Sequence, residues 1–290
     1  MPYTLVIGDR SYSSWSLRGW LLFAAFDIPV TTRKVRLYTD ELATMLAAYP
    51  PARTAPTLII DDSLVVFESA AIAEELASRH PDAGLWPADP NARAVARSVT
   101  AEMHAGFTAL RGYCPMNLRA AYTDCAPPAD VLADLDRLQI LWNWARATTG
   151  STGPWLCGDY SVADVFFAPV ATRIATYNLP VGPTAAAYVA AHLAHPAFRQ
   201  WRAMGHADGA DQDYYHRDYP TKAWPGPARL HARAVDGTQS ENAACPYSGK
   251  LVTHVLELDG RRFGFCNAFC RDKTVADPAA WPKFMAIYQS

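Results

Sequence analysis

Short apolar runs alternate with amphipathic stretches through the first eighty residues, which indicates strands and helices that take turns in a mixed layer. The amphipathic stretches repeat their apolar residues every three or four positions, as one buried helix face requires. A hairpin is indicated where Asp61, Asp62 and Ser63 separate two apolar runs. The predicted order is β-α-β-α-β-β-α. The predicted strands are residues 4–8, 30–37, 57–60 and 64–67, and the predicted helices are residues 17–26, 41–49 and 69–79.

Longer helical patterns follow residue 90, where the strand signal largely stops. Apolar residues recur at three- and four-residue intervals along each segment. Ser161 and Asp164 have the spacing of a capping box, in which a hydroxyl and a carboxylate each accept from a backbone amide at a helix start. The pattern predicts an all-α domain over residues 90–205. Its helices are expected over residues 92–113, 130–148, 162–174 and 185–193, with a short one after Pro196.

The last third of the chain begins with a stretch rich in Asp, Tyr, Pro, Gly and His and without a sustained period. We therefore predict a long linker over residues 206–242. Asp259 and Gly260 then separate two apolar runs, residues 251–258 and 261–265, and this dipeptide favours a tight hairpin. A small module containing a β-hairpin and a helix is therefore expected over residues 243–290.

A length of 290 residues agrees with this division, because single hydrophobic cores rarely grow so large. Half of the residues are hydrophobic and the formal charge is −2, which is typical of a globular protein and argues against a general nucleic-acid or membrane binder. The apolar run at the N-terminus reaches charge at Asp9, too early for a signal peptide or a spanning helix. We expect a cytoplasmic protein.

Several hydroxyls lie between the first predicted strand and the first predicted helix, within residues 12–18. A hydroxyl at a helix start lies among unpaired backbone amides and the positive end of the helix dipole. It can donate to a thiolate, lower the pKa of the thiol and so activate the sulfur as a nucleophile. Ser13 and Ser14 are the candidates. The alternative is that one of these serines only caps the helix.

Two more junctions carry residues suited to binding a peptide-like ligand. Ala55 and Pro56 precede an apolar strand, and a cis proline there would turn the Ala55 backbone toward an extended peptide; trans geometry is the alternative. Glu68 and Ser69 begin the next helix. The carboxylate of Glu68 could bind an ammonium while Ser69 and the first helical amides bind a carboxylate. A simple helix cap is the alternative at this junction.

Together these features resemble the active-site serine region, the cis-proline loop and the γ-glutamyl-binding corner of glutathione transferases, especially serine-type, zeta-like bacterial members. The pair Ser161 and Asp164 resembles the capping box of that family's C-terminal domain. The resemblance covers about residues 1–205. It implies a thioredoxin-like glutathione-binding domain over residues 1–82, an all-helical C-terminal domain, glutathione as cosubstrate, and a homodimer.

The same resemblance implies roles for individual residues. Ser13 would hydrogen-bond the glutathione sulfur, with Ser14 as the alternative. Tyr12 stays a further candidate, because other classes use a tyrosine or a cysteine. The Ala55 backbone would pair with the cysteinyl part of glutathione. The glutathione-binding residues expected on this basis are Ser13, Ala55, Pro56, Glu68 and Ser69.

A pocket for the second substrate is expected between the glutathione sulfur and the helical domain. Trp15, Met103, Phe107 and Arg111 are predicted to line it, although Met103 and Phe107 also fit a role in the core. Zeta-class members have a cysteine two positions after the catalytic serine, where this chain has Trp15. That difference bears on the maleylacetoacetate isomerase activity typical of the class.

We therefore expect a glutathione transferase that activates the glutathione thiol for attack on a small electrophilic or reducible substrate, as in detoxification. Two alternatives remain open. One is a non-catalytic binding or regulatory protein with a metal-sensing or partner-binding tail. The other is a glutathione-dependent disulfide reductase or a zeta-like isomerase.

Three of the six cysteines gather in the last fifty residues, at Cys245, Cys266 and Cys270. A segment of this size rarely has a hydrophobic core large enough to stabilise its fold, and a bound metal such as zinc commonly supplies the missing stability. The spacing resembles the small treble-clef-like metal-binding modules of the TRASH and YHS type over about residues 243–284. Ser248 stands where a fourth cysteine would be, so His254 is considered as a fourth ligand. The alternative is three reduced structural cysteines.

Overall fold

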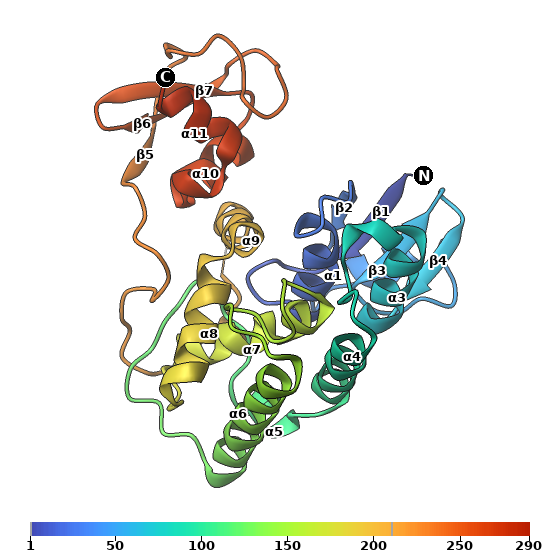
Figure 1. The fold of residues 1–290 in the computed structure, drawn as a ribbon. Helices are drawn as coiled ribbons and strands as arrows, with labels where there is room; N and C mark the ends of the chain where they lie inside the picture. The colour runs from blue at the N-terminus through green and yellow to red at the C-terminus, as the bar shows by residue number, and fades with distance from the viewer. Residues whose placement is uncertain (1, 210) are drawn as a thin grey trace. The chain divides into compact units, whose positions relative to one another are not determined.

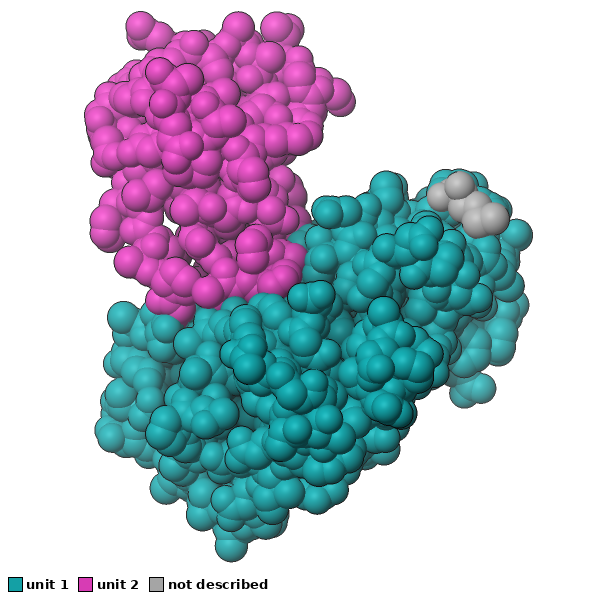
Figure 2. All heavy atoms as spheres, in the orientation of Figure 1, with its two compact units in different colours: residues 1–193, 213–225 teal, residues 194–212, 226–290 magenta. Residues whose placement is uncertain are grey.

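The computed structural model describes residues 2–209 and 211–290. The chain forms two compact units (Figure 2). Unit 1 comprises residues 1–193 and 213–225, and unit 2 comprises residues 194–212 and 226–290. Among the helices of the described residues, none combines the length and apolar character needed to cross a membrane.

Unit 1 begins with a four-stranded mixed sheet in the order β2-β1-β3-β4 (Figure 1). The central strand β1 (Tyr3–Ile7) pairs in parallel with β2 (Thr31–Lys34) and antiparallel with β3 (Thr57–Ile60). The edge strand β4 (Leu64–Phe67) pairs antiparallel with β3. The sheet confirms the thioredoxin-like α/β domain that the alternating pattern predicts.

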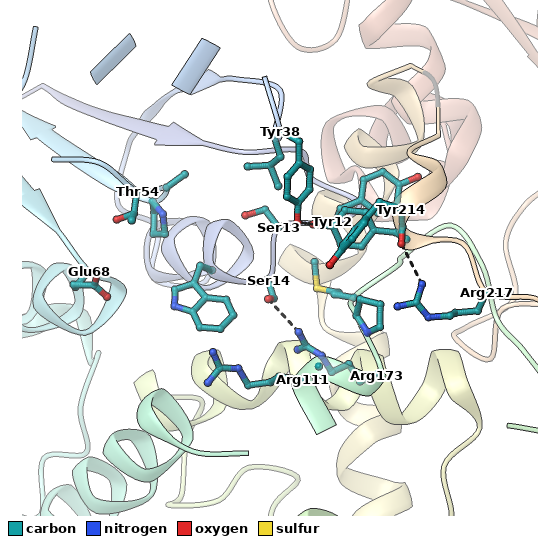
Figure 3. A pocket seen from close by; sticks show the side chains of 18 residues that line it. Tyr12, Ser13, Ser14, Tyr38, Thr54, Glu68, Arg111, Arg173, Tyr214 and Arg217 are labelled. Carbon is teal, nitrogen blue, oxygen red and sulfur yellow. Dashed lines mark hydrogen bonds between the residues drawn. The ribbon is translucent and has the colours of Figure 1, made fainter. Parts of the chain in front are cut away.

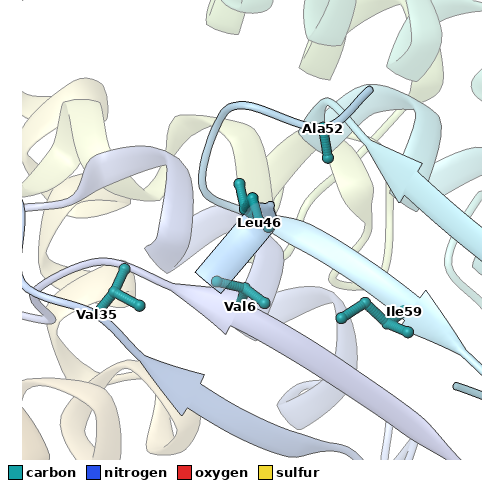
Figure 4. Close-up of a cluster of buried hydrophobic side chains, with 5 residues drawn as sticks. All are labelled: Val6, Val35, Leu46, Ala52 and Ile59. Carbon is teal, nitrogen blue, oxygen red and sulfur yellow. The ribbon is translucent and has the colours of Figure 1, made fainter. Parts of the chain in front are cut away.

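One face of this sheet carries a compact apolar cluster under helix α2 (Glu41–Leu46) (Figure 4). Val6 and Ile59 contribute from adjacent strands, because side chains on a strand alternate between its two faces. Leu46 descends from α2 onto them. Burial of each of these side chains contributes about 1.5–3 kcal/mol. The remaining members of the cluster are Val35 and Ala52.

The opposite face of the sheet is covered by α1 (Ser14–Ala24), which packs against α3 (Ser69–Arg79). Gly19 allows the loop before β3 to lie directly on α1, because a Cβ there would stand 2.7 Å from the Pro56 Cβ. The Ala55–Pro56 peptide is cis. This close approach places the proline loop beside the N-terminal half of α1.

The helical part of unit 1 is built around α7 (Val162–Tyr177), all of whose residues are buried. Both α1 and α4 (Pro90–Ala105) pack against α7, and α4 also packs against α6 (Ala129–Thr149). The capping box of Ser161 and Asp164 is present at the start of α7. These helices confirm the predicted all-α domain. Helix α8 (Pro183–Ala194) follows α7 in the chain.

The single helix predicted over residues 92–113 is two helices, α4 and α5 (Thr108–Tyr113). The break falls at Gly106 and Phe107, where Gly106 is extended and Phe107 has a φ of 60°. Phe107 and Leu110 are nonetheless both buried. The apolar repeat continues through the break, so periodicity cannot reveal it.

Unit 2 contains a three-stranded antiparallel sheet in the order β5-β6-β7. The hairpin between β6 and β7 turns at Asp259 and Gly260, both with positive φ, as the predicted tight turn requires. Helix α9 packs against α10 within this unit. The elements are α9 (Pro196–Ala207), β5 (Ala232–Val235), β6 (His254–Leu258), β7 (Arg261–Phe265), α10 (Ala268–Ala276) and α11 (Pro282–Tyr288).

The structure divides the C-terminal third differently from the predicted boundaries. Helix α9, predicted as the end of the helical domain, belongs to unit 2, where Arg199 makes a bidentate ion pair with Asp277 at 2.7 and 2.9 Å. The predicted linker, residues 206–242, contains strand β5 and also the segment 213–225 that returns to unit 1. Strand β5 shows no clear alternation of apolar residues, since it is a half-exposed edge strand.

Candidate functional site

A cavity of about 450 Å³ lies in unit 1 at the N-terminal end of α1 (Figure 3). Its lining brings together side chains from the serine loop, the proline loop and the β4–α3 junction, which are far apart in the sequence. The predicted site residues that line it are Ser13, Ser14, Trp15, Ala55, Pro56, Glu68 and Arg111.

Ser13 is both the N-cap of α1 and a wall of the cavity. Its Oγ accepts from the Ser16 amide at 3.3 Å and donates to the Ser16 Oγ at 2.7 Å. The Gly8 amide in turn donates to the Ser16 Oγ at 2.9 Å. In this arrangement the Ser13 proton is directed at Ser16, so activation of a sulfur in the cavity requires the Ser13 hydroxyl to rotate and donate to the sulfur instead, while its lone pair still caps the helix. Capping and thiol activation are therefore compatible.

Ser14 is held by a buried cation. Its Oγ accepts from the Arg173 Nη2 at 3.2 Å, while the Arg173 Nε donates to the Cys114 carbonyl at 2.8 Å. Burial lowers the pKa of Arg173 to about 10, so the guanidinium stays charged at neutral pH. A hydroxyl that accepts from a cation keeps its own proton for a second partner. Ser14 can thus also donate toward the cavity (Figure 3).

Glu68 lies at the β4–α3 junction with a φ of 69°, a backbone conformation that is rare for residues other than glycine. Half of its side-chain surface is exposed, and its Oε2 is 3.7 Å from the His104 Nε2. Burial, followed by the charge of Arg18, lowers the pKa of His104. The histidine is therefore mostly neutral at pH 7, and Glu68 keeps its charge for a ligand cation.

Ser69 does not line the cavity as predicted but lies buried behind Glu68, at the first position of α3. Its Oγ has no hydrogen-bond partner among the described residues. A buried hydroxyl without a partner is costly, and it stands beside the unpaired first amides of an eleven-residue helix. Because the hydroxyl is buried outside the cavity, the first amides of α3 are the groups at this junction that suit a ligand carboxylate.

Three arginines lie together in the lining of the cavity. Only one of them, Arg111, was predicted from the sequence. Arg111 lies over the Trp15 ring with its guanidinium carbon 4.4 Å from the ring centroid. Arg173 comes from the buried helix α7, and Arg217 comes from the segment 213–225. Glu68 is the one carboxylate in the described lining, so the arginine side of the cavity is strongly cationic.

Aromatic residues from the predicted linker complete the wall. In the short helix η2 (Asp213–Tyr215), Tyr215 stacks on Tyr12 with ring centroids 4.6 Å apart. The Tyr215 hydroxyl is 3.1 Å from that of Tyr38, and Tyr214 packs against Tyr38 at 5.3 Å. We did not predict these contacts from the sequence, although a run of tyrosines in an otherwise polar segment indicates that the segment packs against other aromatic residues.

Two residues predicted for the second-substrate pocket are in the core instead. Met103 has no exposed surface, and Phe107 is 6% exposed. Met103 lies on the buried face of α4, and Phe107 fills the break between α4 and α5. Neither lines the cavity.

A separate group of side chains in unit 2 could hold a metal. The sulfurs of Cys245, Cys266 and Cys270 all lie within 4.8 Å of one another, and those of Cys266 and Cys270 are 4.0 Å apart. Tetrahedral zinc with Zn–S bonds of about 2.3 Å spaces its sulfurs about 3.8 Å apart. Small side-chain movements would therefore fit these three thiols to one zinc ion.

The surroundings favour ionisation of the Cys245 thiol and oppose ionisation of the Cys270 thiol. Burial raises the pKa of Cys245, but amide donors from Cys266, Tyr247 and Ser248 outweigh it and bring the pKa to about 7. Burial and the nearby Cys245 charge raise the pKa of Cys270 to about 12. One thiolate therefore opposes ionisation of the next, and a bound cation would remove that conflict.

The predicted fourth ligand, His254, is not part of this cysteine group within the described residues. Its Nδ1 is 2.9 Å from the Thr253 Oγ1, at the start of β6. Ser248, which stands where a fourth cysteine was expected, instead donates its hydroxyl proton to the Cys266 sulfur at 3.2 Å. The structure therefore offers three ligands.

Comparison with known proteins agrees with the geometry of unit 1. Residues 12–79 match the family model described as Glutathione S-transferase, N-terminal domain. Over 179 residues, the chain is 28% identical to a Caenorhabditis elegans protein named probable maleylacetoacetate isomerase. That alignment covers 60% of this chain and 79% of the worm protein.

Solved structures share the fold at low sequence identity. A glutathione transferase homolog from Burkholderia GL BGR1, with bound glutathione, matches with a TM-score of 0.54 and 24% identity. The match covers 71% of this chain and 98% of that one. Glutathione transferase Omega 3C from Trametes versicolor matches with a TM-score of 0.55 and 17% identity, over 74% of this chain and 92% of that one. The expected glutathione transferase fold is confirmed.

Proposed function

We propose that the chain is a glutathione-dependent enzyme, from the premise that residues 12–79 match the model of the glutathione S-transferase N-terminal domain. In the proposed reaction Ser13 donates to the glutathione sulfur and stabilises its thiolate, which then attacks a small electrophilic substrate. Ser14 is the alternative donor. Activation of the thiol and its positioning against the second substrate would supply most of the catalysis.

The observation that carries this proposal is the meeting of three junctions in one cavity. The hydroxyls at the start of α1 suit the sulfur, the Ala55 backbone suits the cysteinyl peptide unit, and Glu68 suits the γ-glutamyl ammonium. The first amides of α3 suit the γ-glutamyl carboxylate. Each part of glutathione thus has a chemically matched group.

We further propose that the second substrate carries a carboxylate. Arg111, Arg173 and Arg217 line the same side of the cavity, and Arg173 also contacts Ser14, beside the expected sulfur. Guanidiniums favour carboxylates because they can donate two parallel hydrogen bonds. This charge favours, as a second candidate function, glutathione-dependent isomerisation of an unsaturated keto acid, the type of activity for which the worm relative is named.

Two further features are proposed. Zinc is proposed for the group of Cys245, Cys266 and Cys270, because their sulfurs are spaced nearly as tetrahedral zinc requires. A homodimer is proposed because Leu64 and Phe67, on the edge strand β4, leave large apolar side chains exposed.

The test is calorimetric titration of glutathione into wild type, Ser13→Ala and Ser14→Ala, with the pKa of the bound thiol followed by thiolate absorbance. Loss of a charge-assisted hydrogen bond costs about 1.5–3 kcal/mol, so the pKa of the bound thiol should rise by about 1–2 in the variant that lacks the donor. Ser98→Ala, on the exposed side of α4, is the matched control.

The possible results distinguish Ser13 from Ser14 as the thiol-activating residue, and an enzyme from a non-catalytic binding protein. A raised thiol pKa in Ser13→Ala alone supports Ser13, and the same result in Ser14→Ala alone moves the role to Ser14. Glutathione binding without turnover of any electrophile would favour the non-catalytic alternative. Absence of glutathione binding by the wild type would refute the proposed function.

A further inference from the structure

The cysteine group of unit 2 supplies one ligand fewer than a closed zinc site. Structural zinc sites are almost always saturated by four protein ligands, whereas sites that exchange a ligand keep three and leave one position open. Among the described residues, the group of mutually close histidine, cysteine and carboxylate ligands ends at Cys245, Cys266 and Cys270. Within the part of the chain that the structure describes, no fourth histidine, cysteine or carboxylate ligand joins these three sulfurs.

The open side of the group faces solvent. Cys245 is 2% exposed, whereas Cys266 and Cys270 are partly exposed and the neighbouring Ser248 and Asn267 are exposed. Both neighbours turn polar groups to the Cys266 sulfur, the Ser248 hydroxyl at 3.2 Å and the Asn267 amide at 3.4 Å. The partly exposed sulfurs of Cys266 and Cys270 therefore make this the solvent-accessible side of the group.

The protein positions the three cysteines firmly, as an exchangeable site requires. The turn after Cys245 is closed by hydrogen bonds of its amide to the Lys250 carbonyl and of its carbonyl to the Gly249 amide, both 2.9 Å. Asn267 caps α10 by accepting from the Cys270 amide at 2.8 Å. The three ligands thus come from a tight turn, a strand end and a helix start.

A cation stands next to the group. The Lys273 Nζ is held 3.9 Å from the centroid of the Tyr247 ring and 4.0 Å from that of Trp281, and its charge acts on Cys270. Three thiolates on a zinc ion leave a net charge of −1. A nearby ammonium lowers the cost of adding one more anionic ligand.

We propose that the fourth position of this site binds the thiolate of a small-molecule thiol of the glutathione class. The inference rests on the zinc site proposed above. A soft sulfur donor matches the three sulfurs already present better than an oxygen ligand does. With zinc held by these three cysteines, the thiol would lose its proton to solvent and its sulfur would take the fourth ligand position, with no change of oxidation state. The chain would then hold glutathione-type thiols at two chemically different sites.

The test uses the full-length chain loaded with cobalt(II), whose sulfur-to-metal absorption reports ligands of the ion and not those of the cavity in unit 1. Glutathione should raise that absorption by about one third, as expected for a fourth sulfur added to three. S-methylglutathione, which has no thiol, should leave it unchanged. Ser248→Cys should show the higher absorption from the start and no response to glutathione, and Cys125→Ser, in unit 1, serves as the control.

The outcomes distinguish the two proposals. If one cobalt ion binds per chain but its absorption does not change on addition of glutathione, the inference is overturned and the three-cysteine metal site is supported. If neither zinc nor cobalt binds, or if Cys266→Ser binds them as well as the wild type, the metal site itself is refuted and the inference fails with it. Removal of the ion by glutathione, detected after ultrafiltration, would also overturn the inference.

Discussion

Replacement of Asp164 by alanine should destabilise unit 1 more than any single change at the surface. The buried carboxylate joins the loop before α7, the helix start and a neighbouring helix. Its Oδ1 accepts from the Leu156 amide at 3.1 Å and from the Tyr188 hydroxyl at 2.8 Å. Its Oδ2 accepts from the Ser161 amide at 3.0 Å. Asp164→Ala leaves these three donors buried without their acceptor.

The expected magnitude follows from these three donors. A buried donor left without a partner costs about 1–3 kcal/mol, and partial relaxation should keep the sum near the lower end, at about 3–5 kcal/mol. The whole stability of a domain is about 5–15 kcal/mol. The variant should therefore unfold unit 1 at a clearly lower urea concentration, with a smaller effect on unit 2.

The loss should also depend on pH. Burial raises the pKa of Asp164 from 3.8 to about 6, so the folded state binds this proton more tightly than the unfolded state does. The stability that the group contributes through this shift is complete below pH 3.8 and is lost as the pH rises through about 6. The difference between wild type and Asp164→Ala should consequently be about 1 kcal/mol larger at pH 5 than at pH 7.5.

Urea titrations followed by tryptophan fluorescence, together with scanning calorimetry to separate the two units, provide the measurement. The exposed Asp159, five positions earlier, gives the control Asp159→Ala. Tyr188→Phe removes one of the donors and should cost about 1 kcal/mol. If Asp164→Ala loses no more stability than Asp159→Ala, or if its loss grows from pH 5 to pH 7.5, the reasoning about the buried carboxylate is refuted.

Two predictions concern the cavity. Glu68→Gln keeps the shape of the junction but removes its charge, so the Kd for glutathione should rise by about 10–100-fold in calorimetry, with an unchanged melting temperature. An unchanged Kd would show that Glu68 does not bind the γ-glutamyl ammonium. Arg217→Ala should raise the KM for an electrophile that carries a carboxylate by about tenfold and leave that for its methyl ester unchanged. Equal effects on acid and ester would contradict a role in charge recognition.

The part of the site nearest the N-terminus could be predicted because each of its residues stands at an element boundary. Ser13 precedes an amphipathic helix, Pro56 precedes an apolar strand, and Glu68 directly follows an apolar strand. At such boundaries the backbone offers unpaired amides or carbonyls, and the residue type shows which ligand group these could bind. At these boundaries the same residues therefore indicate both where an element begins or ends and which ligand group could bind.

The cationic and aromatic walls could not be predicted in the same way, because tertiary contacts assemble them. Arg173 lies on a helix whose other residues are almost all apolar, and Tyr215 and Arg217 lie in a segment without periodicity. The one cation on this buried helix was the available signal, since a buried arginine requires acceptors. Its three acceptors belong to Ser14, Cys114 and Pro169.

Arg111 lines the cavity, although the continuous helix predicted to carry it is two helices. We predicted it on the face of one continuous helix over residues 92–113, but the helix breaks at Gly106 and restarts after Phe107. The Arg111 amide donates to the Phe107 carbonyl at 3.0 Å, and its Nη1 donates to the Gly106 carbonyl at 3.0 Å. The side chain is thus tied to the break itself and held over Trp15. An uninterrupted helix would bond the Gly106 carbonyl to its own next turn. The interruption that the apolar repeat hides therefore sets the position of this guanidinium in the cavity.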